Sequence, residues 1–135
     1  MFPNSGVSLP RVTMDSKKLA LLCRDLADNK KAENLLVLDV RKLSSVTDFF
    51  VLATGTSMPH VRAIVEAVTD GLRKDHDLRP RVVDGSPAGG WVVLDYFDVL
   101  IHVMHAATRE RYDLESLCGD APAVKPRKTK TVVEK

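Results

Sequence analysis

Acidic and histidine side chains gather in the last third of the chain, where they could act as metal ligands. Asp95, Asp98, His102 and His105 lie close together in the sequence. A closed zinc site needs about four converging ligands. His102 and His105 are separated by an odd number of positions, so on a regular strand their side chains point to opposite faces of the sheet. The spacing therefore disfavours a metal site, and we expect no metal.

The stretch ATGTSMPHV, residues 53–61, stands where a phosphate-binding loop would stand, between an apolar run and an amphipathic one. With Asp48 it could serve nucleotidyl or phosphoryl transfer. It lacks the lysine of a G-x-x-x-x-G-K-[ST] loop and the further glycines of a dinucleotide fingerprint. A sharp turn at Gly55, a cap at Ser57 and Pro59 in the first turn suffice to begin a helix. We therefore expect a helix cap and no cofactor.

A third group combines aromatic and methionine side chains with charges. Its members are Trp91, Asp95, Tyr96, Phe97, His102 and Met104. Trp, Tyr and Met are enriched at protein interfaces, so the group could form the outer face of a hairpin that binds a partner. The same side chains also fill cores, and composition does not separate the two interpretations.

The elements that position these residues follow from hydrophobic periodicity. Helical spacing of apolar residues predicts helices over residues 16–30 and 57–74, and a last helix along Ala107, Arg111, Leu114 and Cys118. Short apolar runs predict strands at residues 34–40, 49–54, 79–85, 91–97 and 99–104. The predicted order is α-β-β-α-β-β-β-α.

The length of the connections predicts how these strands pair. Strand 49–54, the long helix and strand 79–85 form a βαβ unit, whereas the other neighbours are joined by connections short enough for antiparallel pairing. A chain of 135 residues with 44% hydrophobic content has material for one compact core. We therefore expect a single α/β domain with a mixed five-stranded sheet.

The two ends of the chain differ from its middle. Residues 1–14 contain prolines and little periodicity, which predicts a flexible leader, and Met14 is an alternative start. Residues 119–135 are Pro-interrupted and basic, which predicts a disordered tail able to make weak contacts with RNA. The domain is then expected over residues 15–118.

Charge and cysteine content exclude several classes of protein. The net charge of +2 does not by itself demand a nucleic acid. Cys23 and Cys118 are too few and too far apart for a disulfide scaffold, which favours reduced thiols and a cytoplasmic location. No apolar stretch approaches the ~20 residues that span a bilayer, so we expect no membrane association.

Several spaced motifs resemble the ribosomal silencing factor family, also called Iojap-like, over roughly residues 15–118. They are SSVTDFFVLATGTSMPHVRAIVEAV, GGWVVLDYFDVLIHVM and RERYDLESL. Within them, the residues that match the family pattern are Ser45, Asp48, Thr54, Gly55, Ser57, His60, Val61, Trp91, Asp95, Asp98, His102, Val103, Arg111, Tyr112, Leu114 and Glu115. The chain departs from the pattern at Phe97, where family members usually have glycine, and at Cys118, where an aromatic residue is common. Without glycine at the hairpin turn, we expect a looser turn or one of another type.

The resemblance implies a fold similar to that of nucleotidyltransferases, without their catalytic apparatus, and a factor that is not an enzyme. It implies binding to the large ribosomal subunit through its universal ribosomal protein numbered fourteen, and repression of translation by blocking the joining of the small subunit. The residues expected to bind this partner are Trp91, Asp95, Tyr96, Asp98, His102 and Met104, with Trp91 and Tyr96 as anchors.

Two other functions stay open at this point. One is the nucleotidyl or phosphoryl transfer enzyme that would use residues 55–57 with Asp48. The other is a basic-tailed RNA-binding module. The sequence also leaves open whether the free protein forms a homodimer.

Overall fold

The structure, a computed structural model, describes residues 15–45, 47–113 and 121–124. Its elements are α1 (Ser16–Asp28), β1 (Glu33–Asp39), β2 (Phe49–Gly55), α2 (Met58–His76), β3 (Val82–Ser86), the short 3-10 helix η2 (Pro87–Gly89), β4 (Trp91–Asp95), β5 (Val99–His105) and α3 (Ala106–Tyr112). The predicted order of helices and strands is confirmed. None of the helices in these ranges has the length and apolarity needed to cross a membrane.

The strands form one mixed sheet in the order β1-β2-β5-β4-β3. The antiparallel pairs β1–β2, β3–β4 and β4–β5 are those that the short connections predict. The parallel pair β2–β5 is not predictable from such connections, because the strands are far apart in the sequence. The β4–β5 hairpin fits between β2 and β3, so the crossover through α2 spans two intervening strands.

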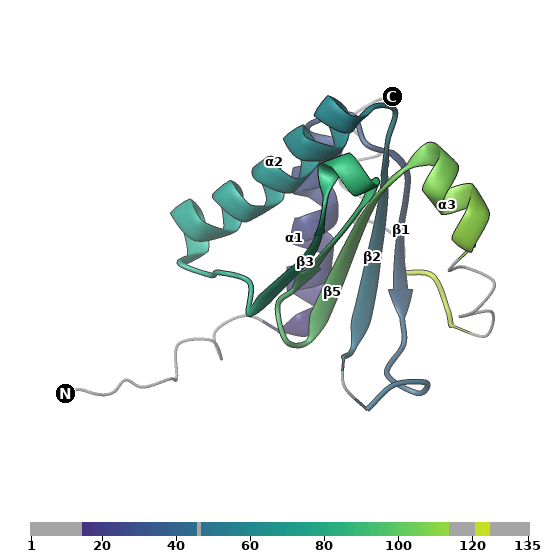
Figure 1. Cartoon of the computed structure of the whole chain (residues 1–135). Coiled ribbons are helices and arrows are strands. Elements are labelled where there is room, and N and C mark those ends of the chain that lie inside the picture. The colour runs from purple at the N-terminus through teal and green to yellow at the C-terminus, as the bar shows by residue number, and fades with distance from the viewer. Residues whose placement is uncertain (1–14, 46, 114–120, 125–135) are drawn as a thin grey trace, which may run out of the picture.

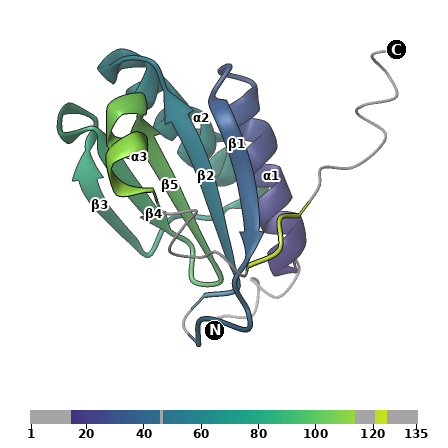
Figure 2. The same ribbon diagram turned by 90° about the vertical axis from the view of Figure 1, so that its right-hand side faces the viewer.

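One face of the sheet is covered by α1 and α2, and Figures 1 and 2 show both helices on that side. Alternate residues of the strands point into this layer, including Val51 of β2 and Ile101 of β5, and both are completely buried. From the helices, Ala20, Cys23 and Ile64 join the same cluster. This is the larger of the two clusters of buried apolar residues and forms the main core.

The opposite face of the sheet, which we call the open face, carries the other half of the alternating residues. Its smaller buried cluster comprises Leu38, Val40, Leu52 and Met104, with Leu36, Phe50, Trp91 and Ala121 packed against it. The short helix α3 lies on this side of the sheet (Figures 1 and 2). No residue of α1 or α2 belongs to this cluster.

The turn between β2 and α2 is a helix cap, as the sequence predicts. Ser57 is the N-cap, its hydroxyl accepts from the His60 backbone N–H at 3.2 Å, and a proline stands in the first turn. Gly55 lies at this turn and also has a packing role that the sequence does not reveal. A Cβ atom there would lie 2.8 Å from a side-chain carbon of Val61, so glycine is needed for the close approach of α2 and not for a positive φ.

His60 adds a connection that the sequence does not reveal. Its Nδ1 accepts from the Thr56 backbone N–H at 2.8 Å, and its Nε2 lies 2.8 Å from the carbonyl oxygen of Lys30. With Nδ1 acting as the acceptor, the neutral ring carries its proton on Nε2 and donates it to this carbonyl. The imidazole therefore joins the loop before β1 to the first turn of α2.

Part of the segment expected to be a disordered tail is paired with the sheet. The Asp39 N–H donates to the Pro122 carbonyl at 2.9 Å, and the Val124 N–H donates to the Val37 carbonyl at 2.8 Å. Residues 121–124 therefore cover part of the outer edge of β1, an edge that would otherwise expose unpaired backbone groups. The predicted boundary at residue 118 is too early on this evidence. The leader, residues 114–120 and residues 125–135 lie outside the described ranges.

Candidate docking face

Trp91 lies at the start of β4 with a half-buried side chain on the open face. Its indole N–H donates to Nδ1 of His102 at 3.2 Å. The rings of Tyr112 and His102 have their centroids 5.0 and 6.1 Å from that of Trp91, and Phe50 meets His102 edge-on at 5.2 Å. We call Phe50, Trp91, His102 and Tyr112 the aromatic cluster. Its contacts hold the indole in one orientation.

His102 is the polar centre of this cluster. Because its Nδ1 accepts from the indole, the neutral ring carries its proton on Nε2, which is buried without a hydrogen-bond partner among the described residues. Burial disfavours the charged imidazolium and lowers the pKa of His102 to about 4. The ring is therefore neutral at physiological pH, and the aromatic cluster carries no charge.

Arg109 fastens α3 beside the cluster. Its buried guanidinium donates from Nη1 to the carbonyl of Asn34 at 2.6 Å and to the hydroxyl of Thr54 at 2.8 Å. These bonds tie α3 to the start of β1 and the end of β2, and they place Tyr112 against Trp91. Tyr112 keeps 48% of its surface exposed, so it extends the aromatic cluster outward.

The predicted partner-binding residues do not all share this surface. Tyr96 is on the opposite face, buried in the main core at 5% exposure, and its hydroxyl has no hydrogen-bond partner among the described residues. Burial also raises its pKa. Its predicted place on an outer face with Trp91 is wrong. Tyr96 directly follows β4 and continues the alternation of Val92 and Leu94, which point into the main core, whereas Trp91 points to the open face. Met104 is on the open face but fully buried. It is the residue opposite Trp91 in the β4–β5 pair, so it packs beneath the half-buried indole.

Phe50 and Tyr112 are the members of the cluster that the sequence argument missed. Phe50 follows Phe49 directly, and only strand alternation separates the core ring from the ring on the open face. Tyr112 belongs to a quoted motif, but its contact with Trp91 joins α3 to a strand distant in sequence. Hydrophobic periodicity does not predict that contact.

Asp95 and Asp98 flank the turn between β4 and β5. Asp95 pairs with Arg81 at 2.8 Å and accepts from the Phe97 N–H at 2.8 Å. The Asp98 carbonyl accepts from the backbone of Asp48, and its side chain is exposed. The turn has a positive φ although it lacks the usual glycine, because Phe97 itself adopts a φ of 74°.

The residues of the proposed enzyme site are not brought together. Asp48 precedes β2 and accepts from the Ser16 hydroxyl at 2.9 Å, whereas residues 55–57 stand at the other end of that strand. A strand of this length separates them by about 20 Å. Within the described ranges, no group of histidine, cysteine, aspartate or glutamate side chains is placed to hold a metal ion.

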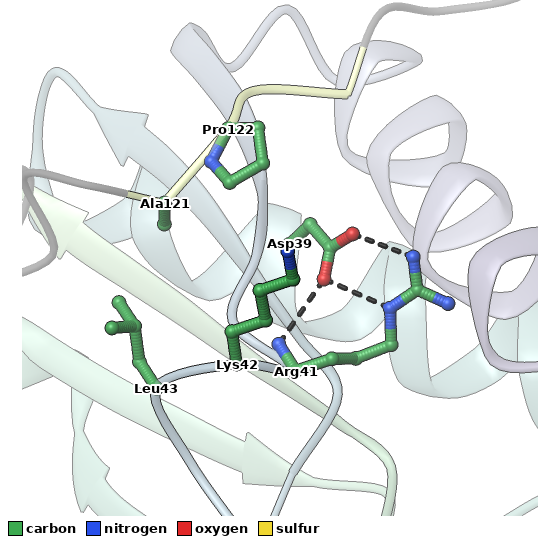
Figure 3. A pocket seen from close by; sticks show the side chains of 6 residues that line it. All are labelled: Asp39, Arg41, Lys42, Leu43, Ala121 and Pro122. Atoms are coloured by element: carbon green, nitrogen blue, oxygen red, sulfur yellow. Dashed lines mark hydrogen bonds and ion pairs between the residues drawn. The ribbon is translucent and has the colours of Figure 1, made fainter.

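A cleft of about 690 Å³ lies between the β1–β2 loop and the C-terminal segment, lined by Asp39, Arg41, Lys42, Leu43, Ala121 and Pro122 (Figure 3). Arg41 donates to both carboxylate oxygens of Asp39, at 2.9 and 2.6 Å. This pairing lowers the pKa of Asp39 and raises that of Arg41. The cleft wall is thus fixed by an internal ion pair, which leaves Arg41 poorly placed to bind an external anion.

Comparison with known proteins decides the family. Residues 13–135 match the family described as "Ribosomal silencing factor during starvation". The chain belongs to the ribosomal silencing factor family. It is 34% identical to the ribosomal silencing factor of Bacillus subtilis over 109 residues, which are 81% of this chain and 92% of the relative. Members of this family are regulators of translation that act through the ribosome, as the motifs imply.

A solved structure and a more distant relative extend this comparison. A crystal structure of a Chromobacterium violaceum protein superposes with a TM-score of 0.74 at 32% identity, covering 84% of this chain and 92% of that one. A mouse protein named "Mitochondrial assembly of ribosomal large subunit protein 1" is 31% identical over 97 residues, covering 68% of this chain and 41% of the relative. The ribosomal silencing factor fold is therefore the fold of this chain.

Proposed function

We propose that this silencing factor represses translation by docking its open face on the large ribosomal subunit, at the universal ribosomal protein numbered fourteen. The observation that carries the proposal is the aromatic cluster on a sheet face that α1 and α2 leave uncovered. The Trp91 indole is half-buried and oriented by His102, and Tyr112 lies beside it. Oriented aromatic side chains of this kind dominate the energetics of protein interfaces.

The mechanism is steric exclusion. A docked domain occupies the surface to which the small subunit must bind, so the factor needs sufficient affinity and no catalysed reaction. A standard interface covers about 800 Å² on each partner. The exposed carboxylate of Asp98, directly before β5, adds a charge suited to a basic ribosomal surface.

Sedimentation with separated ribosomal subunits tests the proposal. The protein should sediment with large subunits and not with small ones, and adding it before the subunits are mixed should lower the fraction of joined ribosomes. Equal binding to both subunits, or normal joining at saturating protein, would contradict the proposal. Purified large-subunit protein numbered fourteen should compete for binding.

The alternative of an RNA-binding tail is tested with a deletion placed according to the structure. Removing residues 125–135 keeps the segment that pairs with β1 and removes Lys125, Arg127, Lys128 and Lys130. Subunit affinity should fall modestly and mainly at low salt, because exposed lysine and arginine contacts to phosphates are screened. Complete loss of binding at every salt concentration would favour the RNA-binding alternative.

A further inference from the structure

The two edges of the sheet differ in how their backbone groups are covered. At the β1 edge, residues 121–124 form two backbone hydrogen bonds, one from the Asp39 N–H and one to the Val37 carbonyl. The other edge is β3, which pairs on one side only, with β4. Within the described ranges, no residue forms a β-bridge or a backbone hydrogen bond with its outer side. The backbone groups of β3 that point away from β4 are therefore available to an added strand.

The side chains of β3 leave this edge accessible and apolar. All five residues of the strand are exposed. Val82 is opposite Asp95 of β4 and lies on the open face, whereas Val83 is opposite Leu94 and lies on the face covered by α1 and α2. The two valines keep 45% and 53% of their surface exposed. Edge strands are commonly protected by lysine, proline or inward-pointing charges, but an added strand here would contact a valine on each face.

Gly85 limits the part of β3 that can pair outward. It has a φ of 83°, and a Cβ atom there would lie 2.1 Å from the carbonyl oxygen of Trp91. A glycine of this kind allows a close approach of two backbones and a departure from regular strand geometry. The regular part of the free edge is therefore residues 82–84, which is close in length to the segment 121–124 that pairs with β1.

The position and charge of this edge indicate what binds there. Ser86 of β3 is opposite Trp91, so the edge lies one strand, or about 4.8 Å, from the strand that carries the indole. A partner that covers about 800 Å² around Trp91 therefore reaches β3. Asp84 is exposed on the same side of the sheet, opposite Val93, and forms no ion pair among the described residues. Its carboxylate repels RNA phosphates and attracts the lysine and arginine side chains of a basic protein.

We propose that the outer edge of β3 is a strand-addition site, at which an extended segment of the docked large-subunit protein pairs with residues 82–84. The segment places apolar side chains against the two valines and a lysine or arginine beside Asp84. Backbone hydrogen bonds give such a contact its affinity, and the alternating side chains give it specificity. The proposal rests on the proposed function, because it assigns a second contact to the same partner.

Hydrogen exchange in the unchanged full-length protein tests the backbone pairing. In the free protein, the amides of residues 82–84 that point away from β4 should exchange rapidly. Purified large-subunit protein numbered fourteen should slow their exchange by about tenfold or more, because the added strand accepts from them. Equal exchange rates at residues 82–84 in the free and bound protein would overturn the proposal.

Val83→Lys tests the edge without altering the open face, because Val83 points to the other face of the sheet. A lysine on the edge opposes strand addition and repels a basic segment, so affinity for large subunits should fall about tenfold while the circular dichroism stays unchanged. Asp84→Lys is a second variant at an exposed position and should weaken binding similarly. Val83→Thr keeps a β-branched side chain and should bind within about twofold of the unchanged protein.

Met58→Lys provides the matched control, because it makes the same change of charge at an exposed apolar residue (52%) in the first turn of α2. It should bind large subunits normally. Normal binding by folded Val83→Lys and Asp84→Lys would overturn the proposal. If Val83→Lys abolished a dimer of the free protein but left subunit binding intact, the edge would bind a second copy of the chain and the proposal would again be wrong.

The same measurements separate this inference from the proposed function. If the unchanged protein failed to bind large subunits, both would be wrong. If it bound, and Trp91→Ala weakened binding while the β3 variants did not, only the strand-addition site would be wrong.

Discussion

Leu100 and Ile101 are neighbours on β5, yet their side chains serve different faces of the sheet. Ile101 is completely buried between the sheet and the layer formed by α1 and α2, whereas Leu100 is partly exposed on the open face. The buried cluster of the covered face is almost entirely aliphatic and needs only volume and apolarity. The open face adds rings and a directional hydrogen bond to its aliphatic residues, as a binding surface requires. Strand alternation lets one short strand contribute to both.

The largest expected difference between the faces is in folding stability. Ile101→Ala should lower the free energy of unfolding by about 2–5 kcal/mol, because it leaves a cavity in the main core. Leu100→Ala should cost about 1 kcal/mol, because its side chain is already partly in water. Urea unfolding of both variants measures the difference. Equal costs would mean that the open face is packed as a second core.

The pH dependence of stability should report the burial of His102. Its folded-state pKa of about 4 lies below the unfolded value of 6.5, so the neutral ring stabilises the fold above pH 6.5, and this contribution is lost as the pH falls toward 4. Between pH 7.5 and pH 5 the loss should be about 2 kcal/mol. His102→Gln should remove most of this dependence in denaturant titrations at each pH. If the unfolding free energy of His102→Gln changed with pH as much as that of the unchanged protein, other titratable groups would be the cause of the pH dependence.

A smaller effect is expected at the start of α2, away from both faces. Ser57→Ala should lower the unfolding free energy by about 1 kcal/mol, because the His60 N–H loses its acceptor. Millimolar nucleotide should leave the melting temperature unchanged. Stabilisation by nucleotide would instead indicate a phosphate site at this turn.

The smallest expected effect is a gain of stability on the covered face. The Tyr96 hydroxyl is buried without a hydrogen-bond partner among the described residues, so Tyr96→Phe should raise the unfolding free energy by up to about 1 kcal/mol and leave subunit affinity unchanged. Weaker subunit binding by this variant would restore Tyr96 to the docking face. Calorimetry and sedimentation of the same preparation give both results.

The sequence predicted the order of the elements because local signals define each of them. Helical spacing marked α2, alternating and apolar runs marked the strands, and Ser57 marked the cap. Pairings between distant segments have no such local signal. The parallel β2–β5 pair and the contact of residues 121–124 with β1 are examples, since both depend on how the sheet closes.

The candidate site was predictable in type but not in detail. Trp91 and His102 were recognised from their residue types and the family pattern, and they are in direct contact. The position of Tyr96 is not predictable from composition, because Tyr96 and Phe97 are adjacent and composition does not indicate which ring is buried. Phe97 proved to be the exposed residue, and only the backbone geometry of the turn shows it.

The central claim is that the open face, and not the helical layer, docks on the large subunit. It is tested most directly by the subunit affinity of Trp91→Ala, after circular dichroism has shown that the variant is folded. Glu66→Ala, an exposed change on α2, is the control. Trp91→Ala should bind large subunits at least tenfold more weakly, as expected for an interface anchor, and Glu66→Ala should bind normally. Normal binding by folded Trp91→Ala, with a defect in Glu66→Ala, would contradict the claim.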